Sequence, residues 1–79
     1  MRDVEIRSEP VELYKLLKFE GMASSGGEAK SVIAEGLVTV NGETETRKRK
    51  KILAGDIVGF AGEEIRVQTT PHSQENRSL

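Results

Sequence analysis

The sequence predicts an α+β domain, in which two short helices pack on a small, mostly antiparallel sheet with a short N-terminal strand. Two segments in the first half of the chain place apolar residues at the i, i+3, i+4 spacing of amphipathic helices. After residue 37 the period changes to two, as in a half-buried strand, and the dipeptide Asn41-Gly42 then predicts a hairpin. A chain of 79 residues has room for one such core.

Alternating apolar and polar residues at 4–7 predict a short edge strand at the start of the chain. The first helix is expected from about Glu9 to Phe19, because Ser8 can cap its first turn and Pro10 is tolerated there. Gly21 would end it. The apolar stripe of this helix consists of Leu13, Leu16 and Leu17.

A second helix is expected to begin at Ser25, which forms a capping box with Glu28. In this motif the serine hydroxyl accepts from a backbone N–H of the first turn, and the glutamate reaches back. Gly36 stands where a left-handed residue ends many helices. The apolar stripe consists of Ala29, Val32 and Ile33.

The register of the hairpin at Asn41-Gly42 stays open at this stage. A two-residue loop would place Val40 opposite Glu43, which is unusual if the valine faces the core, and a longer loop is equally compatible. Further strands are expected at 57–60 and 65–67. We therefore expect one domain over residues 1–68, followed by a disordered polar tail at 69–79.

Five cationic residues follow one another in a chain whose net charge is only −1. They are Arg47, Lys48, Arg49, Lys50 and Lys51. Lysines also protect exposed sheet edges, but one or two would serve that purpose, and five adjacent like charges repel one another. The run therefore predicts an anion-binding segment, with nucleic acid as the leading partner. If the segment is extended, its odd-numbered and even-numbered residues point to opposite sides.

Weaker signals come from three lysines and two serines outside this run. Lys15, Lys18 and Lys30 could line one face with it, and Ser24 and Ser25 could let a phosphate approach the backbone closely. We expect the run to contribute more to binding than the three lysines.

Catalytic chemistry has little support in this sequence. The single histidine, His72, lies in the expected tail, and the chain has no cysteine. We therefore expect a protein that is not an enzyme and that needs no metal and no cofactor. No segment has the length and apolar character of a signal peptide or a membrane span, so a cytoplasmic monomer without a membrane partner is expected.

Several motifs together resemble the S4 RNA-binding domain, which is named after a small-subunit ribosomal protein. They are Leu13-Tyr14-Lys15-Leu16-Leu17-Lys18, Gly21-Met22-Ala23-Ser24-Ser25, Glu28-Ala29-Lys30, Glu35-Gly36, Val38-Thr39-Val40-Asn41-Gly42 and Ala54-Gly55-Asp56-Ile57. The small size and the segment at 46–49 look most like the stand-alone, YbcJ-type members. Many family members carry basic residues at five positions where this chain has Glu12, Gly26, Gly27, Ser31 and Leu37.

The resemblance implies the alpha-L motif, a helix pair packed on a small sheet that contacts structured RNA. It also implies a non-catalytic role, with ribosomal RNA, transfer RNA, the ribosome or its assembly factors as partners. The alternative is a protein-interaction adaptor whose basic segment docks on an acidic partner. Because double-helical RNA hides its base edges, recognition through phosphates and shape is expected.

Overall fold

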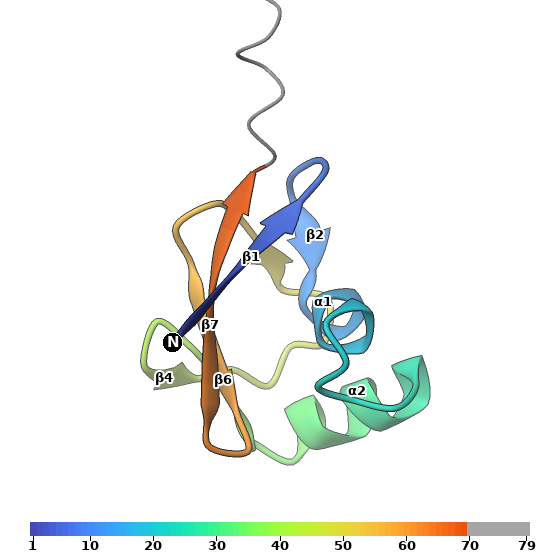
Figure 1. Ribbon diagram of the computed structural model, residues 1–79. Helices are drawn as coiled ribbons and strands as arrows, with labels where there is room; N and C mark the ends of the chain where they lie inside the picture. The colour runs from blue at the N-terminus through green and yellow to red at the C-terminus, as the bar shows by residue number, and fades with distance from the viewer. Residues whose placement is uncertain (70–79) are drawn as a thin grey trace, which may run out of the picture.

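Two helices cover one face of a sheet in the computed structural model, which describes residues 1–69 (Figure 1). This arrangement confirms the predicted α+β architecture. In chain order the elements are β1 (Arg2–Ile6), β2 (Val11–Glu12), α1 (Leu13–Phe19), α2 (Gly26–Ala34), β3 (Val38–Val40), β4 (Glu43–Thr44), β5 (Lys51–Ile52), β6 (Ile57–Phe60) and β7 (Glu63–Thr69).

The described residues form a five-stranded sheet in the order β1-β7-β6-β3-β4. Its pairs are antiparallel except for β1 and β7, which run parallel, so β1 occupies the predicted edge position. A separate two-stranded ladder joins β2 to β5, with Glu12 opposite Lys51. This short ladder links the start of α1 to the end of the basic run.

The core lies between the sheet and the two helices. Alternate strand residues point inward, while α1 and α2 supply their apolar stripes. The fully buried side chains are Leu13, Leu16, Leu17, Ile33, Val38, Ile52, Val58, Ile65 and Val67. Within residues 1–69 no polar or charged side chain is buried, so charged groups are available only at the surface.

The predicted start of the first helix is wrong. α1 begins at Leu13 rather than Glu9, because Val11 and Glu12 are extended and pair with β5. Glu12, not Ser8, is the N-cap residue, and its side chain makes no capping hydrogen bond. The helix therefore spans only the segment that carries the leucine stripe.

The predicted start of the second helix is confirmed. The Ser25 hydroxyl accepts a hydrogen bond from the backbone N–H of Glu28 at 3.1 Å. The Glu28 carboxylate reaches back one residue further than a capping box requires, to the N–H and hydroxyl of Ser24. Gly36, at φ 80°, follows the helix as expected.

The hairpin after β3 has a strict two-residue loop, with Val40 opposite Glu43. Asn41 and Gly42 both have positive φ, 54° and 86°, as a type I′ turn requires. The Asn41 side chain donates to Asp56 at 3.1 Å and accepts from the N–H of Ile57 at 3.0 Å. These bonds attach the hairpin to the turn before β6.

The predicted division into residues 1–68 and a polar tail stays a prediction. Thr69 is the last residue of β7. Residues 70–79, which include His72 and most of the expected tail, lie outside the described residues. Neither helix in residues 1–69 is long and apolar enough to cross a membrane.

Candidate nucleic-acid interface

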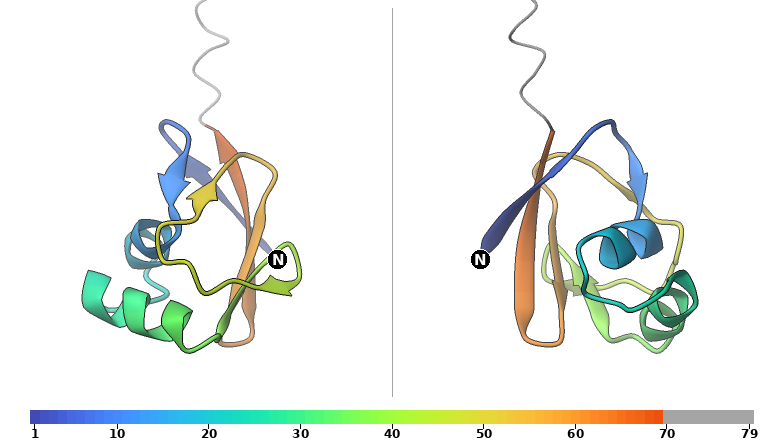
Figure 2. Two further views of the ribbon diagram at one scale, coloured as in Figure 1. Left: turned by 180° about the vertical axis from the view of Figure 1, so that it is seen from behind. Right: turned by 45° about the vertical axis from the view of Figure 1, so that its right-hand side comes forward.

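The basic run passes directly beside the N-terminus of α1 (Figure 2). The carbonyl of Lys50 accepts from the N–H of Leu13 at 2.9 Å, and the carbonyl of Lys48 accepts from the N–H of Tyr14 at 3.1 Å. These bonds satisfy two N–H groups that a helix start leaves free. The backbone of the run therefore caps the helix, while its side chains extend around it.

The run is not a continuous extended strand, so the expected alternation of its side chains is absent. Residues 48 and 49 form a turn that is closed by a hydrogen bond from the N–H of Lys50 to the carbonyl of Arg47, at 3.1 Å. Lys51 alone belongs to a strand. Because of this turn, the charged side chains of the run point in different directions.

Arg47 faces the hairpin and is held by an acid. Its guanidinium and its backbone N–H both donate to the Glu45 carboxylate, with two contacts of 2.9 Å. The Arg47 side-chain hydrogen bond, followed by its backbone N–H, lowers the pKa of Glu45 to about 2. The same contact raises the pKa of Arg47. A phosphate that binds Arg47 must therefore compete with a carboxylate that stays ionised.

Arg49 points the other way, toward the ring of Tyr14. Around this ring lie three cations from three segments of the chain. Their charged groups lie 6.0 Å (Lys15, Nζ), 4.7 Å (Lys30, Nζ) and 5.9 Å (Arg49, Cζ) from the ring centroid. Such distances allow cation–π attraction, which offsets part of the repulsion among the cations. We call these four residues, Tyr14, Lys15, Lys30 and Arg49, the Tyr14 cluster.

Glu12 borders the Tyr14 cluster as an internal counter-ion. Its carboxylate oxygens lie 3.6 Å from Nζ of Lys15 and 4.0 Å from Nη1 of Arg49. The side chains of the two cations are about half exposed, at 48% and 61%. Surface ion pairs of this kind are weak, so a polyanion can displace the carboxylate.

The remaining predicted contacts lie near this cluster or are already engaged. Lys18 is exposed, with its ammonium 5.6 Å from the centroid of Phe19. The hydroxyls of Ser24 and Ser25 both take part in the cap of α2. The Ser24 hydroxyl, and then its backbone N–H, lower the pKa of Glu28, so a negative charge already occupies this turn. Lys48 and Lys51 are exposed.

Sequence reasoning thus found the cations but not the role of Tyr14, whose ring three of them surround. A signal for Tyr14 was present, because it lies four residues before Lys18, and residues at this spacing are neighbours on a helix surface. The approach of Lys30 and Arg49 is a tertiary feature that spacing does not show.

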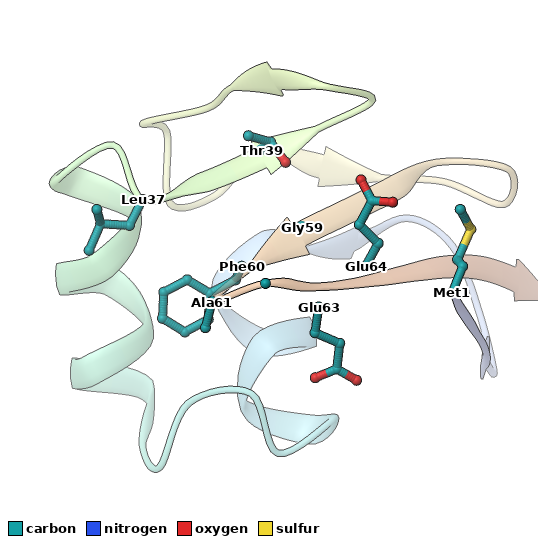
Figure 3. A pocket seen from close by; sticks show the side chains of 9 residues that line it. Met1, Leu37, Thr39, Gly59, Phe60, Ala61, Glu63 and Glu64 are labelled. Atoms are coloured by element: carbon teal, nitrogen blue, oxygen red, sulfur yellow. The ribbon is translucent and has the colours of Figure 1, made fainter.

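A shallow pocket on another part of the molecule has a different character (Figure 3). It lies at the β6–β7 turn and is lined by Met1, Leu37, Thr39, Gly59, Phe60, Ala61, Gly62, Glu63 and Glu64. This lining contains two carboxylates and no Lys or Arg, and Glu63 and Glu64 point to opposite sides of β7 (Figure 3). This lining has no cluster of basic side chains, so the candidate interface stays at the helices.

Comparisons with known proteins identify the family of this chain. The family model described as S4 domain matches residues 4–68. A protein of Escherichia coli (strain K12) named "Putative RNA-binding protein YbcJ" is 58% identical over 57 residues, which cover 72% of this chain and 81% of that protein. A Bacillus subtilis (strain 168) protein named "Probable ribosome maturation protein RlbA" is 36% identical over 59 residues, which cover 75% of this chain and 83% of that protein.

The fold is also similar to a solved structure. The solution structure of E. coli YbcJ, described as revealing an alpha-L motif involved in RNA binding, superimposes with a TM-score of 0.66. Its sequence is 49% identical, and the match covers 86% of this chain and 87% of that one. The helix pair, the Val-x-Val-Asn-Gly hairpin and the match over residues 4–68 lead to one conclusion: the chain belongs to the S4-domain family.

Proposed function

We propose that this protein is a non-catalytic RNA-binding module that holds structured RNA by its phosphates. The main contacts are Lys15, Lys30 and Arg49 of the Tyr14 cluster. Lys18 and two further exposed residues of the basic run, Lys48 and Lys51, add secondary contacts. The predicted cytoplasmic location and monomeric state stay predictions.

One observation carries the proposal: cations from α1, α2 and the basic run converge on the Tyr14 ring. Separate segments that bring like charges together lose stability through repulsion, and a bound polyanion removes that repulsion. The RNA-binding description of the E. coli structure supports the same ligand class. The ribosome-maturation name of the B. subtilis relative makes ribosomal RNA the class to test first.

The salt dependence of binding tests the proposal. We expect a labelled ribosomal RNA hairpin to bind the full chain with a log–log salt slope on the order of −3.5 to −4.5, from roughly −0.7 to −0.9 for each of about five phosphates. Fluorescence anisotropy over a salt series measures the slope. No binding, or a slope near zero, contradicts the proposal. Capture of a protein partner that survives nuclease treatment, without RNA binding, would support the adaptor alternative.

The Glu12 carboxylate gives a prediction in which a substitution strengthens RNA binding. We expect Glu12→Gln to strengthen RNA binding about two- to fivefold, because it removes a carboxylate that competes with phosphate for Lys15 and Arg49. Anisotropy titrations of the two proteins at equal salt measure the change. Glutamine keeps the size of the side chain, so the β2–β5 ladder is preserved.

Glu64→Gln is the matched control, since it makes the same change in net charge on the sheet, away from the Tyr14 cluster. It is expected to alter affinity less than Glu12→Gln. Equal gains from both variants would assign the effect to net charge, and weaker binding by Glu12→Gln would show that Glu12 supports the interface.

A further inference from the structure

The side of α1 that faces away from the core carries two aromatic and two cationic side chains. Its residues are Tyr14, Lys15, Lys18 and Phe19, while Leu13, Leu16 and Leu17 are buried on the opposite side. The i, i+4 pairs Tyr14–Lys18 and Lys15–Phe19 form a strip along this side of the helix. This strip continues the Tyr14 cluster toward the C-terminal end of α1.

The two aromatic rings on this strip have different surroundings. Tyr14 is partly buried, and its ring lies near the first turn of α2, where a Cβ added to Gly26 would meet ring atoms at 3.9 Å. Lys30 and Arg49 approach the same ring. Phe19, in contrast, is 66% exposed. Tyr14 is thus a positioning residue for the cations, while Phe19 has a ring available to a ligand.

Lys18 connects the two rings. Its ammonium lies 5.6 Å from the centroid of Phe19, and its Cδ lies 4.0 Å from the Cβ position at Gly26, beside Tyr14. A single exposed apolar residue is common on protein surfaces. Phe19 differs because it stands at the end of a cationic strip, with a charge beside its ring. An aromatic face next to a cation suits a nucleotide, which carries a flat base and a phosphate.

We propose that Phe19 is a stacking subsite for an unpaired nucleobase, with Lys18 contacting the phosphate of that nucleotide. The inference rests on the proposed RNA-binding function. Bases inside an A-form stem are stacked on one another, so the base must come from a bulge, loop or end beside the stem. The occupant follows from charge complementarity and from the continuity of Phe19 with the Tyr14 cluster. Stacking is tolerant of base identity, so the subsite selects RNA shape rather than sequence.

Two labelled RNA hairpins that differ only by one bulged nucleotide test the proposal. We expect wild type to bind the bulged RNA about fivefold to 100-fold more tightly than the paired RNA, the range given by one base stacked on an aromatic side chain. Phe19→Ala and Phe19→Leu should remove this preference without changing affinity for the paired RNA. Phe19→Trp should keep it. Leu53→Ala removes an apolar side chain from another exposed residue and should keep it as well.

A fluorescent base analogue, 2-aminopurine, at the bulge gives a direct readout of stacking. Its emission should be quenched further by wild type than by Phe19→Leu. Equal affinity of wild type for the two RNAs, or equal losses on both from Phe19→Ala, would overturn the subsite alone. If wild type binds neither RNA, the proposed function fails and the subsite with it.

Discussion

Replacing Lys15, Lys30 and Arg49 together by glutamine is expected to weaken RNA binding by about 10- to 100-fold and to reduce the salt slope by about 2 to 3. These three charges come from separate segments and meet at the Tyr14 ring. Each exposed cation that contacts a phosphate releases about one counter-ion, so three lost contacts act on both affinity and slope. Anisotropy titrations over a salt series measure both quantities.

A matched variant removes the same charge from three other residues of the basic run. It replaces Arg47, Lys48 and Lys50 by glutamine. Arg47 is already bound to Glu45, and Arg47 and Lys50 share a hollow with three carboxylates, Glu43, Glu45 and Asp56. We expect a smaller loss of affinity than in the first variant. Equal losses of affinity would mean that net charge alone decides binding. A larger loss in this second variant would mean that the basic run, and not the Tyr14 cluster, makes the main contacts with RNA.

The difference between the two variants should persist from neutral to mildly acidic pH. The pKa of Glu45 is about 2, because Arg47 donates hydrogen bonds to its carboxylate. A lowered carboxyl pKa means that the contact is present at higher pH and is lost only as the pH falls toward that value. Mild acid therefore does not release Arg47 for RNA.

Local signals were sufficient for much of the fold. The leucine stripe, the Ser25 cap and the Asn41-Gly42 turn each report on neighbours within a few residues, and the structure confirms all three. The β2–β5 ladder has no such signal, because it joins Val11–Glu12 to Lys51–Ile52 across most of the domain. That ladder is also what overrides the predicted start of the first helix at Glu9.

The candidate site was predictable by residue type but not by arrangement. Charge alone identified Arg47 and Arg49 as equivalent members of one run. The structure separates them, because a turn at residues 48–49 directs one toward Glu45 and the other toward Tyr14. Which cations are free depends on tertiary neighbours such as Glu12, and a charge count does not contain that information.

Leu17→Ala is expected to lower the free energy of unfolding by about 2 to 5 kcal/mol, the usual cost of removing a buried leucine side chain. Leu17 is fully buried between the helices and the sheet. α1 has seven residues, which are too few to form a stable helix alone. The helix that carries the exposed strip is therefore stabilised by packing of its opposite, leucine-bearing face. Urea unfolding followed by circular dichroism and by the fluorescence of Tyr14, the single tyrosine, measures the change.

Leu37→Ala is the matched control for this prediction, because it makes the same chemical change at a residue that is 53% exposed. It should cost less than about 1 kcal/mol and leave RNA binding unchanged, since Leu37 lines the pocket that lacks Lys and Arg side chains. Equal destabilisation by the two variants would show that α1 is not held by this core. Because one helix carries both the leucine stripe and the proposed RNA-binding strip, Leu17→Ala should lose RNA binding in proportion to the unfolded fraction. A loss of affinity in molecules that stay folded would instead mean that packing beneath α1 sets the positions of Lys15 and Tyr14.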